Sequence, residues 1–182
     1  MTDFFENAFD DLIGIEGDFI DDPNDSGGAT RFGVTEAVAR NHGYTGSMRD
    51  FPIEMAQHIY RIAYWDINNL TAVAIMSQPI AFEMFDTGVN CGPGVAANFL
   101  QRSLNVLNRQ QKDFPDIEVD GSIGPASLSA LSSYLNLRGG RGEVVLMRQL
   151  NCLQGAHYTE LAERREKDER FLFGWYWNRI AL

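Results

Sequence analysis

The sequence predicts a mostly α-helical protein with a small irregular or β-hairpin region near residues 17–35. Apolar residues recur at helical spacing through most of the chain, whereas turn-forming residues concentrate between Gly17 and Thr30. The length of 182 residues fits one globular body, at roughly 150 residues per domain. A chain of this size buries enough apolar surface to fold without a disulfide or a metal ion.

The first elements follow from periodicity and capping residues. Phe5, Phe9 and Leu12 predict a helix that ends at about Ile15 or Glu16. Residues 17–30 hold one Pro, three Gly, one Asn and four Asp, which predicts an ordered loop or an irregular hairpin. The next two helices are expected from the N-cap Thr35 to about His42, and from Pro52 onward.

The rest of the chain reads as helices separated by glycine-rich breaks. The expected helices cover residues 79–87 with a stop at Gly88, 93–108 with Val106 inward, 125–135, and 143–164 after a break at 139–142. The charged run at 163–170 mixes signs and is interpreted as the solvated face of one helix. Trp175 and Trp177 are assigned to packing, and Cys91 and Cys152 are interpreted as buried thiols.

Composition excludes several functional classes. The formal net charge of −10 argues against nucleic acid as the main partner, since phosphate binding relies on clustered Lys and Arg. No apolar run approaches the roughly 20 residues of a membrane span, and the acidic N-terminus lacks the features of a secretory signal. The three histidines and two cysteines lack metal-ligand spacing, so neither a metal nor a cofactor is expected.

The carboxylates between residues 16 and 25 are the most unusual feature. Glu16 falls where an apolar helix ends, and burial there would raise its pKa so that it could act as a general acid. A solvated Asp in the following loop would take the opposite role, as glycosidic cleavage requires. The competing interpretation is an ordinary Asp-rich turn, in which the carboxylates cap their own backbone.

Two other chemistries fit the residues less well. A calcium loop that starts at Asp22 matches the first half of the EF-hand pattern, but its twelfth position is Gly33 where a bidentate Glu is needed. A nucleophile built on Cys91 remains an alternative, although this cysteine stands in a turn-like stretch between Asn90 and Gly92.

Five ordered motifs carry a family resemblance. Residues 16–35, EGDFIDDPNDSGGATRFGVT, resemble the signature of glycoside hydrolase family 108, E-G-G-[YF]-x-x-D-P-x-D-x-G-G-x-T-x-x-G-[IV]-T. Similar family motifs follow as IYRIAYW (59–65), FDTGVNCGP (85–93), DGSIGP (120–125) and FGWYWNR (173–179). Two positions depart from the pattern: Asp18 replaces the second glycine of the signature, and Cys91 replaces a serine.

The resemblance implies a lysozyme-like α+β fold and a phage- or prophage-type lysozyme. Such an N-acetylmuramidase hydrolyses the β-1,4 bond between N-acetylmuramic acid and N-acetylglucosamine in peptidoglycan. It also implies a catalytic part at residues 1–91 and a helical predicted peptidoglycan-binding part at 92–182, packed as one globular unit. Glu16 occupies the position of the family's catalytic acid.

The remaining site residues are expected on the same basis. Asp25, nine positions after Glu16, is the first candidate to assist catalysis or activate water, and Asp22 is the second. Thr30 would position that water. Substrate binding is expected from Asp22 together with Thr35, Tyr64, Trp65, Asp86 and Asn90. The alternatives are a core position for the two aromatic residues, and backbone bonding for Asp86 and Asn90.

The expected partner is the peptidoglycan glycan strand, with a holin, a secretion machine or an immunity protein as further candidates. The protein is expected to be made in the bacterial cytoplasm without a signal peptide and to act on the wall in the periplasm after release. Two rival functions stay open. One is a non-catalytic peptidoglycan-binding or secretion and assembly factor, which the acidic charge favours because many lytic enzymes are basic. The other is a peptidoglycan endopeptidase.

Overall fold

The computed structural model describes residues 4–16, 19–20 and 28–180, with the side chains of residues 15 and 16 outside that description. The chain divides into two compact units, an N-terminal unit (Met1–Ala63) and a C-terminal unit (Tyr64–Leu182). Both are built almost entirely from helices, which confirms the predicted mostly α-helical, lysozyme-like class.

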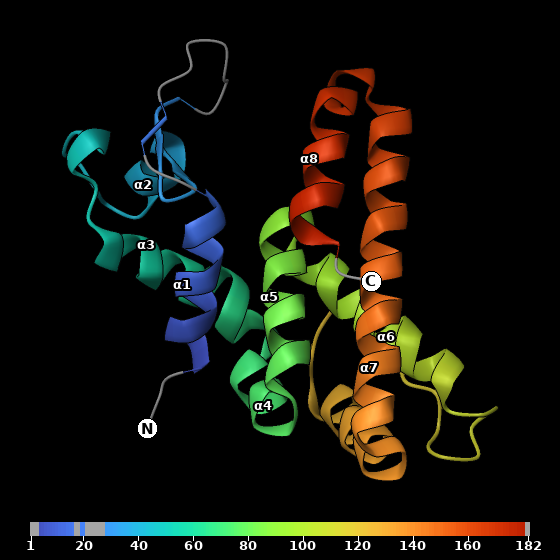
Figure 1. Ribbon diagram of the computed structural model, residues 1–182. Helices are drawn as coiled ribbons and strands as arrows, with labels where there is room; N and C mark the ends of the chain where they lie inside the picture. Colours follow the sequence, from blue (N-terminus) through green and yellow to red (C-terminus); the bar gives the residue numbers. More distant parts are fainter. Residues whose placement is uncertain (1–3, 17–18, 21–27, 181–182) are drawn as a thin grey trace. The chain divides into compact units, whose positions relative to one another are not determined.

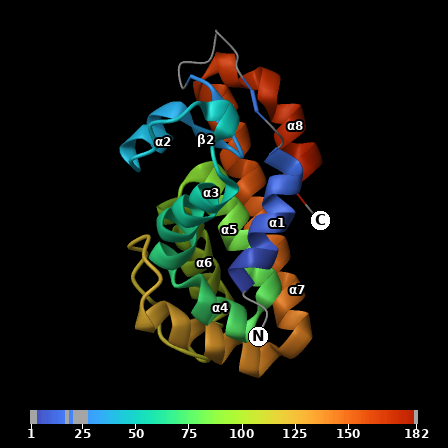
Figure 2. The same ribbon diagram turned by 90° about the vertical axis from the view of Figure 1, so that its left-hand side faces the viewer.

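The N-terminal unit combines three short helices with a small sheet (Figures 1 and 2). Its elements are α1 (Phe4–Glu16), β1 (Thr30–Arg31), β2 (Val34–Thr35), α2 (Glu36–Asn41), the 3₁₀ turn η1 (Met48–Asp50) and α3 (Ile53–Tyr60). Helix α1 buries Phe5, Phe9 and Leu12 on one face. The Phe9 ring meets the ring of Tyr60 from α3 edge-on, with their centroids 5.5 Å apart. This aromatic contact joins the first and third helices of the unit.

The predicted boundaries of this unit are confirmed where they can be compared. Helix α1 ends at Glu16, α2 begins directly after its N-cap Thr35, and Pro52 is the N-cap of α3. The sheet is a single antiparallel pair with Thr30 opposite Thr35 and Arg31 opposite Val34. Phe32 and Gly33 form the turn between the strands at positive φ of 51° and 72°, as a two-residue hairpin turn requires.

The C-terminal unit is a helical bundle around a long, kinked helix (Figure 1). The π-helical segment η2 (Arg61–Trp65) leads into it. The elements that follow are η3 (Asp66–Asn68), α4 (Leu70–Met76), α5 (Gln78–Cys91), α6 (Pro93–Leu107), α7 (Pro125–Arg164), η4 (Glu166–Asp168) and α8 (Glu169–Arg179). Helices α4, α5 and α6 pack against α7, and α8 returns along its C-terminal half (Figures 1 and 2).

Gly88 and Gly92 have different structural roles. The expected stop at Gly88 is wrong: α5 continues to Cys91, and Gly92, with φ of +98°, is its C-cap. Gly88 is buried, and a Cβ there would lie 3.6 Å from the Cα atom of Pro93 in α6. Gly88 is therefore a close-packing position inside a helix. A helix-stop signal and a packing glycine look the same in a single sequence.

Four other expectations are wrong. The charged run is not one helix, because Arg165 leaves helical geometry at φ −136°, ψ 83° and the run is divided among α7, η4 and α8. Val106 is 70% exposed, since it falls on the outer face of α6. Trp177 is 78% exposed on α8 and stacks on Phe173, whereas Trp175 packs against Tyr158. Cys152 is exposed and Cys91 is half-buried.

Candidate functional site

The family signature begins at the end of α1, where Glu16 is the last residue of the helix. The last turn of α1 contains no basic residue that would offset the negative end of the helix dipole. The negative end of a helix dipole disfavours an ionised carboxyl group. The side chain of Glu16 lies outside the described residues, as do Asp22 and Asp25.

Backbone hydrogen bonds tie together the residues that flank the acidic stretch. Ile20 and Thr30 donate to each other's carbonyl groups at 2.8 Å, and the amide of Glu36 donates to Ala29 at 2.8 Å. Thr30 is thus paired with Ile20 on one side and with Thr35 on the other. Among the described residues, the Thr30 hydroxyl makes one long bond of 3.4 Å, to the carbonyl of Gly28. That hydroxyl keeps its capacity to hold a water or a substrate oxygen.

Thr35 has a structural task in this unit. Its hydroxyl accepts a hydrogen bond from the amide of Val38 at 3.4 Å and so caps α2. The predicted role as a substrate contact is not tested by this geometry, but the capping role that its sequence position indicates is confirmed.

Two arginines accompany the hairpin, and the sequence interpretation did not single them out. The guanidinium group of Arg49 lies 4.3 Å from the ring centroid of Phe19, three residues after Glu16. The guanidinium group of Arg31 lies 4.9 Å from the ring centroid of Phe32 and also donates to the carbonyl of Arg49. Each is an isolated basic residue in the sequence, so no spacing pattern marks it.

In the C-terminal unit, Trp65 is a core residue. Its ring is fully buried, and its indole N–H donates to the Thr71 hydroxyl at 2.8 Å. The rings of Phe82 and Phe85 meet it at steep angles. Tyr64 is half-buried, and burial raises the pKa of its hydroxyl. Of the two interpretations open for these aromatics, packing accounts for the surroundings of Trp65.

Asp86 and Asn90 belong to a polar network that connects α5, α7 and α8. The Asn90 amide donates to the backbone carbonyl of Asp86 at 2.8 Å. Arg179 donates to one carboxylate oxygen of Asp86, and Gln154 donates to the other at 3.2 Å. The side chain of Arg179 is only 8% exposed. Two family motifs that lie 93 residues apart therefore meet as a nearly buried ion pair.

Titratable groups surround this ion pair. Burial, with the neighbouring charge of Asp86, raises the pKa of Glu83 to about 7, while Asn151 and Thr87 oppose the shift. Burial also raises the pKa of the Cys91 thiol to about 11, which disfavours the thiolate that a nucleophile needs. No local pattern marks Glu83, since its environment depends on α7 residues such as Asn151, which are distant in the chain.

The DGSIGP motif is also explained by packing. Buried Gln101 on α6 donates to Asp120, to the carbonyl of Ser122 and to Ser127, and accepts from the amide of Gly121. Gly121 has φ of +76°, and a Cβ there would lie 3.3 Å from the carbonyl oxygen of Gly94. The Gln101 amide holds the pKa of Asp120 below its ordinary value. This motif fastens the loop before α7 onto α6.

Two structural absences hold for the described part of the chain. None of its helices is long and apolar enough to cross a membrane. Nor do its His, Cys, Asp and Glu side chains form a group of three or more that could hold a metal ion.

Comparison with known proteins assigns both halves of the chain. Residues 9–92 match the family described as glycosyl hydrolase 108, and residues 95–180 match the predicted peptidoglycan domain. No curated protein matches the chain. A solved structure described as that of Brucella abortus SagA is similar in fold, with a TM-score of 0.63 and 20% sequence identity over 93% of this chain and 94% of that one.

The two family matches include all five motifs on which the resemblance rests, apart from the residues at the junction of the matches. At family level, they make the protein a peptidoglycan-degrading glycosidase. The chain thus combines a glycosyl hydrolase 108 domain with a C-terminal predicted peptidoglycan domain.

Proposed function

We propose that the protein is a muramidase that hydrolyses the β-1,4 bond between N-acetylmuramic acid and N-acetylglucosamine, with Glu16 as its general acid. The observation that carries the proposal is the position of Glu16 within the glycosyl hydrolase 108 match, at the C-terminal end of α1. The negative end of the helix dipole, with no basic residue in the last turn to offset it, supports the proposal because it disfavours an ionised carboxyl group at this position.

The proposed reaction begins with a protonated Glu16 carboxyl group. The Glu16 carboxyl group gives its proton to the glycosidic oxygen as the bond from this oxygen to C1 of N-acetylmuramic acid breaks. Positive charge develops on C1 and the ring oxygen. A water molecule adds to C1 and loses a proton to a carboxylate, for which Asp25 is the first candidate and Asp22 the second. The product carries a reducing N-acetylmuramic acid end.

Thr30 is the candidate that positions the water. Its backbone is held on both sides by pairing with Ile20 and Thr35, while its hydroxyl makes one long bond within the part of the chain that the structure describes. A side chain on a fixed backbone with spare hydrogen-bonding capacity suits this task.

The site of action and the partners are part of the same proposal. The substrate lies in the bacterial wall, so the protein acts there after release from the cytoplasm in which it is made. A holin or a secretion machine would provide that release, and an immunity protein would be needed if the producer's own wall were exposed.

Product analysis tests the proposed bond. Purified sacculi are digested with the wild-type protein, reduced with borohydride and analysed by mass spectrometry. We expect products that end in reduced N-acetylmuramic acid. Reduced N-acetylglucosamine would indicate cleavage of the other glycosidic bond. New free amines without reducing ends would indicate an endopeptidase. No products, together with sedimentation of the protein with the sacculi, would indicate a binding protein without catalytic activity.

A further inference from the structure

A cavity of about 360 Å³ lies where the end of α6 meets the kink of α7, entirely within the C-terminal unit. Leu107, Leu137 and Val145 form its apolar walls together with the ring of Tyr134. The guanidinium-bearing side chains of Arg138 and Arg141 line the same cavity. An apolar pocket with a few convergent polar groups is the usual form of a small-ligand site.

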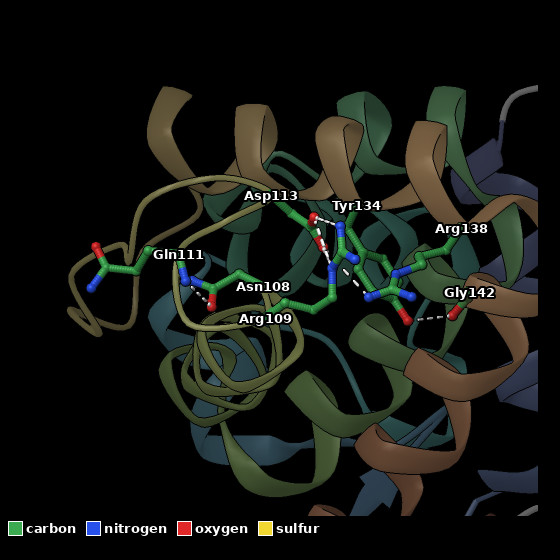
Figure 3. A network of polar contacts seen from close by, with 7 residues as sticks. All are labelled: Asn108, Arg109, Gln111, Asp113, Tyr134, Arg138 and Gly142. Atoms are coloured by element: carbon green, nitrogen blue, oxygen red, sulfur yellow. Dashed lines mark hydrogen bonds and ion pairs between the residues drawn. The ribbon is translucent and has the colours of Figure 1, made fainter.

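Two glycines shape this cavity. Gly139, with φ 58° and ψ −152°, interrupts the helical geometry of α7 at a conformation that is open almost only to glycine. At Gly142, a Cβ would lie 2.2 Å from the Cβ of Arg138 and 3.3 Å from the ring of Tyr134. The Tyr134 hydroxyl donates to the carbonyl of Gly142 at 2.9 Å, so the tyrosine ring is held in place as a wall. Figure 3 shows this bond beside Arg138.

A turn of unusual backbone conformation follows the end of α6, directly after the cavity residue Leu107. Arg109, Gln110 and Gln111 are consecutive non-glycine residues with positive φ of 54°, 59° and 63°. Residues in this region are strained, and strain of this kind is retained where the surrounding structure enforces it. The Asn108 side chain closes the turn by accepting from the amide of Gln111 at 3.0 Å (Figure 3). The turn presents Arg109 and Asp113 to the arginines of α7.

The charge at this place is positive, in contrast to the chain as a whole. Asp113, whose side chain is 3% exposed, accepts from Arg109 and, at 3.4 Å, from Arg138 (Figure 3). Arg109 holds the pKa of Asp113 below its ordinary value. Arg141 is exposed and pairs with no carboxylate among the described residues. Arg109 and Arg138 thus share the Asp113 carboxylate, while Arg141 keeps an unpaired charge within the described residues, in a protein with a formal charge of −10.

We propose that this cavity binds the terminal D-alanine carboxylate of a peptidoglycan stem peptide. Arg141, assisted by Arg138, would take the carboxylate, since a guanidinium group matches a carboxylate in both charge and shape. The methyl group of alanine would lie against Leu107, Leu137 and Val145. The inference rests on the proposed function for the identity of the ligand. It also agrees with the position of the cavity inside the predicted peptidoglycan domain.

The test is a binding titration of the full chain with a synthetic stem tetrapeptide that ends in D-alanine, followed by calorimetry. We expect saturable binding by the wild type and at least tenfold weaker binding by Arg141→Gln, which corresponds to about 1.4 kcal/mol. Arg141→Lys should retain more affinity than Arg141→Gln. The matched control is Arg148→Gln, on the same helix but outside the cavity, and it should bind as the wild type does. Circular dichroism checks that each variant is folded.

A second arm identifies the carboxylate. The same tetrapeptide with an amidated C-terminus keeps its D-glutamate carboxylate, and we expect it to bind at least tenfold more weakly than the free acid. Equal affinity of the acid and the amide would overturn the assignment to the terminal carboxylate. Equal affinity of wild type and Arg141→Gln, or no saturable binding by the wild type, would overturn the proposal.

Separate measurements test the peptide-binding cavity and the proposed muramidase activity, so one can be refuted without the other. Peptide binding is measured without turnover and should be unchanged in Glu16→Gln. A protein that binds the tetrapeptide but releases no reducing ends from sacculi would support the cavity and contradict the muramidase. A protein that releases reducing ends but does not bind the tetrapeptide would contradict the cavity alone.

Discussion

The motifs of the two units differ in how far packing explains them. In the C-terminal unit, the motif around Asp86 and the motif that ends in Arg179 meet in one ion pair, and the DGSIGP loop is fastened by Gln101. In the N-terminal unit, the hairpin accounts for Phe32, Gly33 and Thr35 through their turn and cap geometry. For Glu16, at the end of α1, the proposed function supplies the role.

Residues of a family motif can therefore have either of two roles, a structural one or a chemical one. Residues of the first kind hold the helices together, whereas residues of the second kind would serve the proposed chemistry. The two kinds make opposite predictions for mutants, since one changes the free energy of unfolding and the other changes the rate. The mutants below test this division, beginning with the largest expected effect.

Replacing the proposed acid should have the largest effect. Glu16→Gln removes the transferable proton, and we expect reducing-end release to fall by about 10²–10⁴-fold, the usual contribution of general acid catalysis. The thermal unfolding midpoint should stay within one or two degrees of that of the wild type. Glu6→Gln, an exposed position on the same helix, is the matched control and should keep full activity. A Glu16→Gln protein with wild-type activity would remove the basis of the proposed mechanism.

Breaking the Asp86–Arg179 pair should mainly destabilise the protein. Asp86→Asn leaves the nearly buried guanidinium group of Arg179 without its counter-charge, and we expect a loss of about 3 kcal/mol in the free energy of unfolding. Urea denaturation of Asp86→Asn, Arg179→Gln and the double variant measures the coupling between the two residues. A double variant whose loss equals the sum of the single losses would show that the pair is not coupled. A raised KM at unchanged stability would instead support the predicted substrate contact.

Glu83 should make stability depend on pH. Its pKa of about 7 in the folded protein lies above its ordinary value, so the folded state retains a proton that the unfolded state releases. The free energy of unfolding should therefore fall as the pH rises from about 4.5 to 7, by about 2 kcal/mol once solvent screening is allowed for.

Glu83→Gln removes the titrating group and should flatten the stability profile across this pH window. The variant should then be more stable than the wild type at pH 8, where the wild-type carboxylate is ionised near Asp86. Denaturation midpoints at a series of pH values measure both effects. The exposed Glu163→Gln serves as the control, and a Glu83→Gln profile parallel to that of the wild type would refute the prediction.

The smallest effect is expected at the helix cap. Thr35→Ala removes the hydroxyl that accepts from Val38, and such caps contribute about 1 kcal/mol. Thr35→Ser should restore the stability, because serine supplies the same acceptor. If Thr35→Ala raises KM without a change in the unfolding midpoint, Thr35 contacts substrate. It would then belong with the residues that serve the chemistry and not with those that stabilise the fold.

Much of the fold could be predicted from local signals. The end of α1 at Glu16, the N-caps Thr35 and Pro52, the hairpin and the break near Gly139 each follow from a few neighbouring residues. Errors arose where tertiary packing decided the outcome. Gly88 lies inside a helix because α6 needs room beside it, and Trp177 remains on the surface although its neighbour Trp175 packs.

The candidate sites, too, could be predicted only where a short stretch of sequence determines them. The position of Glu16 could be found from a motif, because a short stretch of chain carries it. The Asp86–Arg179 pair could not, because its members are 93 residues apart and meet only when α8 returns along α7. The raised pKa of Glu83 and the cavity beside Arg141 are equally products of tertiary packing.

The most direct test of the division compares Glu16→Gln with Asp86→Asn on the same preparations. Reducing-end release from purified sacculi and the thermal unfolding midpoint are measured for each. We predict that Glu16→Gln loses at least a hundredfold in rate with an unchanged midpoint, whereas Asp86→Asn lowers the midpoint by several degrees. A Glu16→Gln protein that releases reducing ends at the wild-type rate would contradict the account.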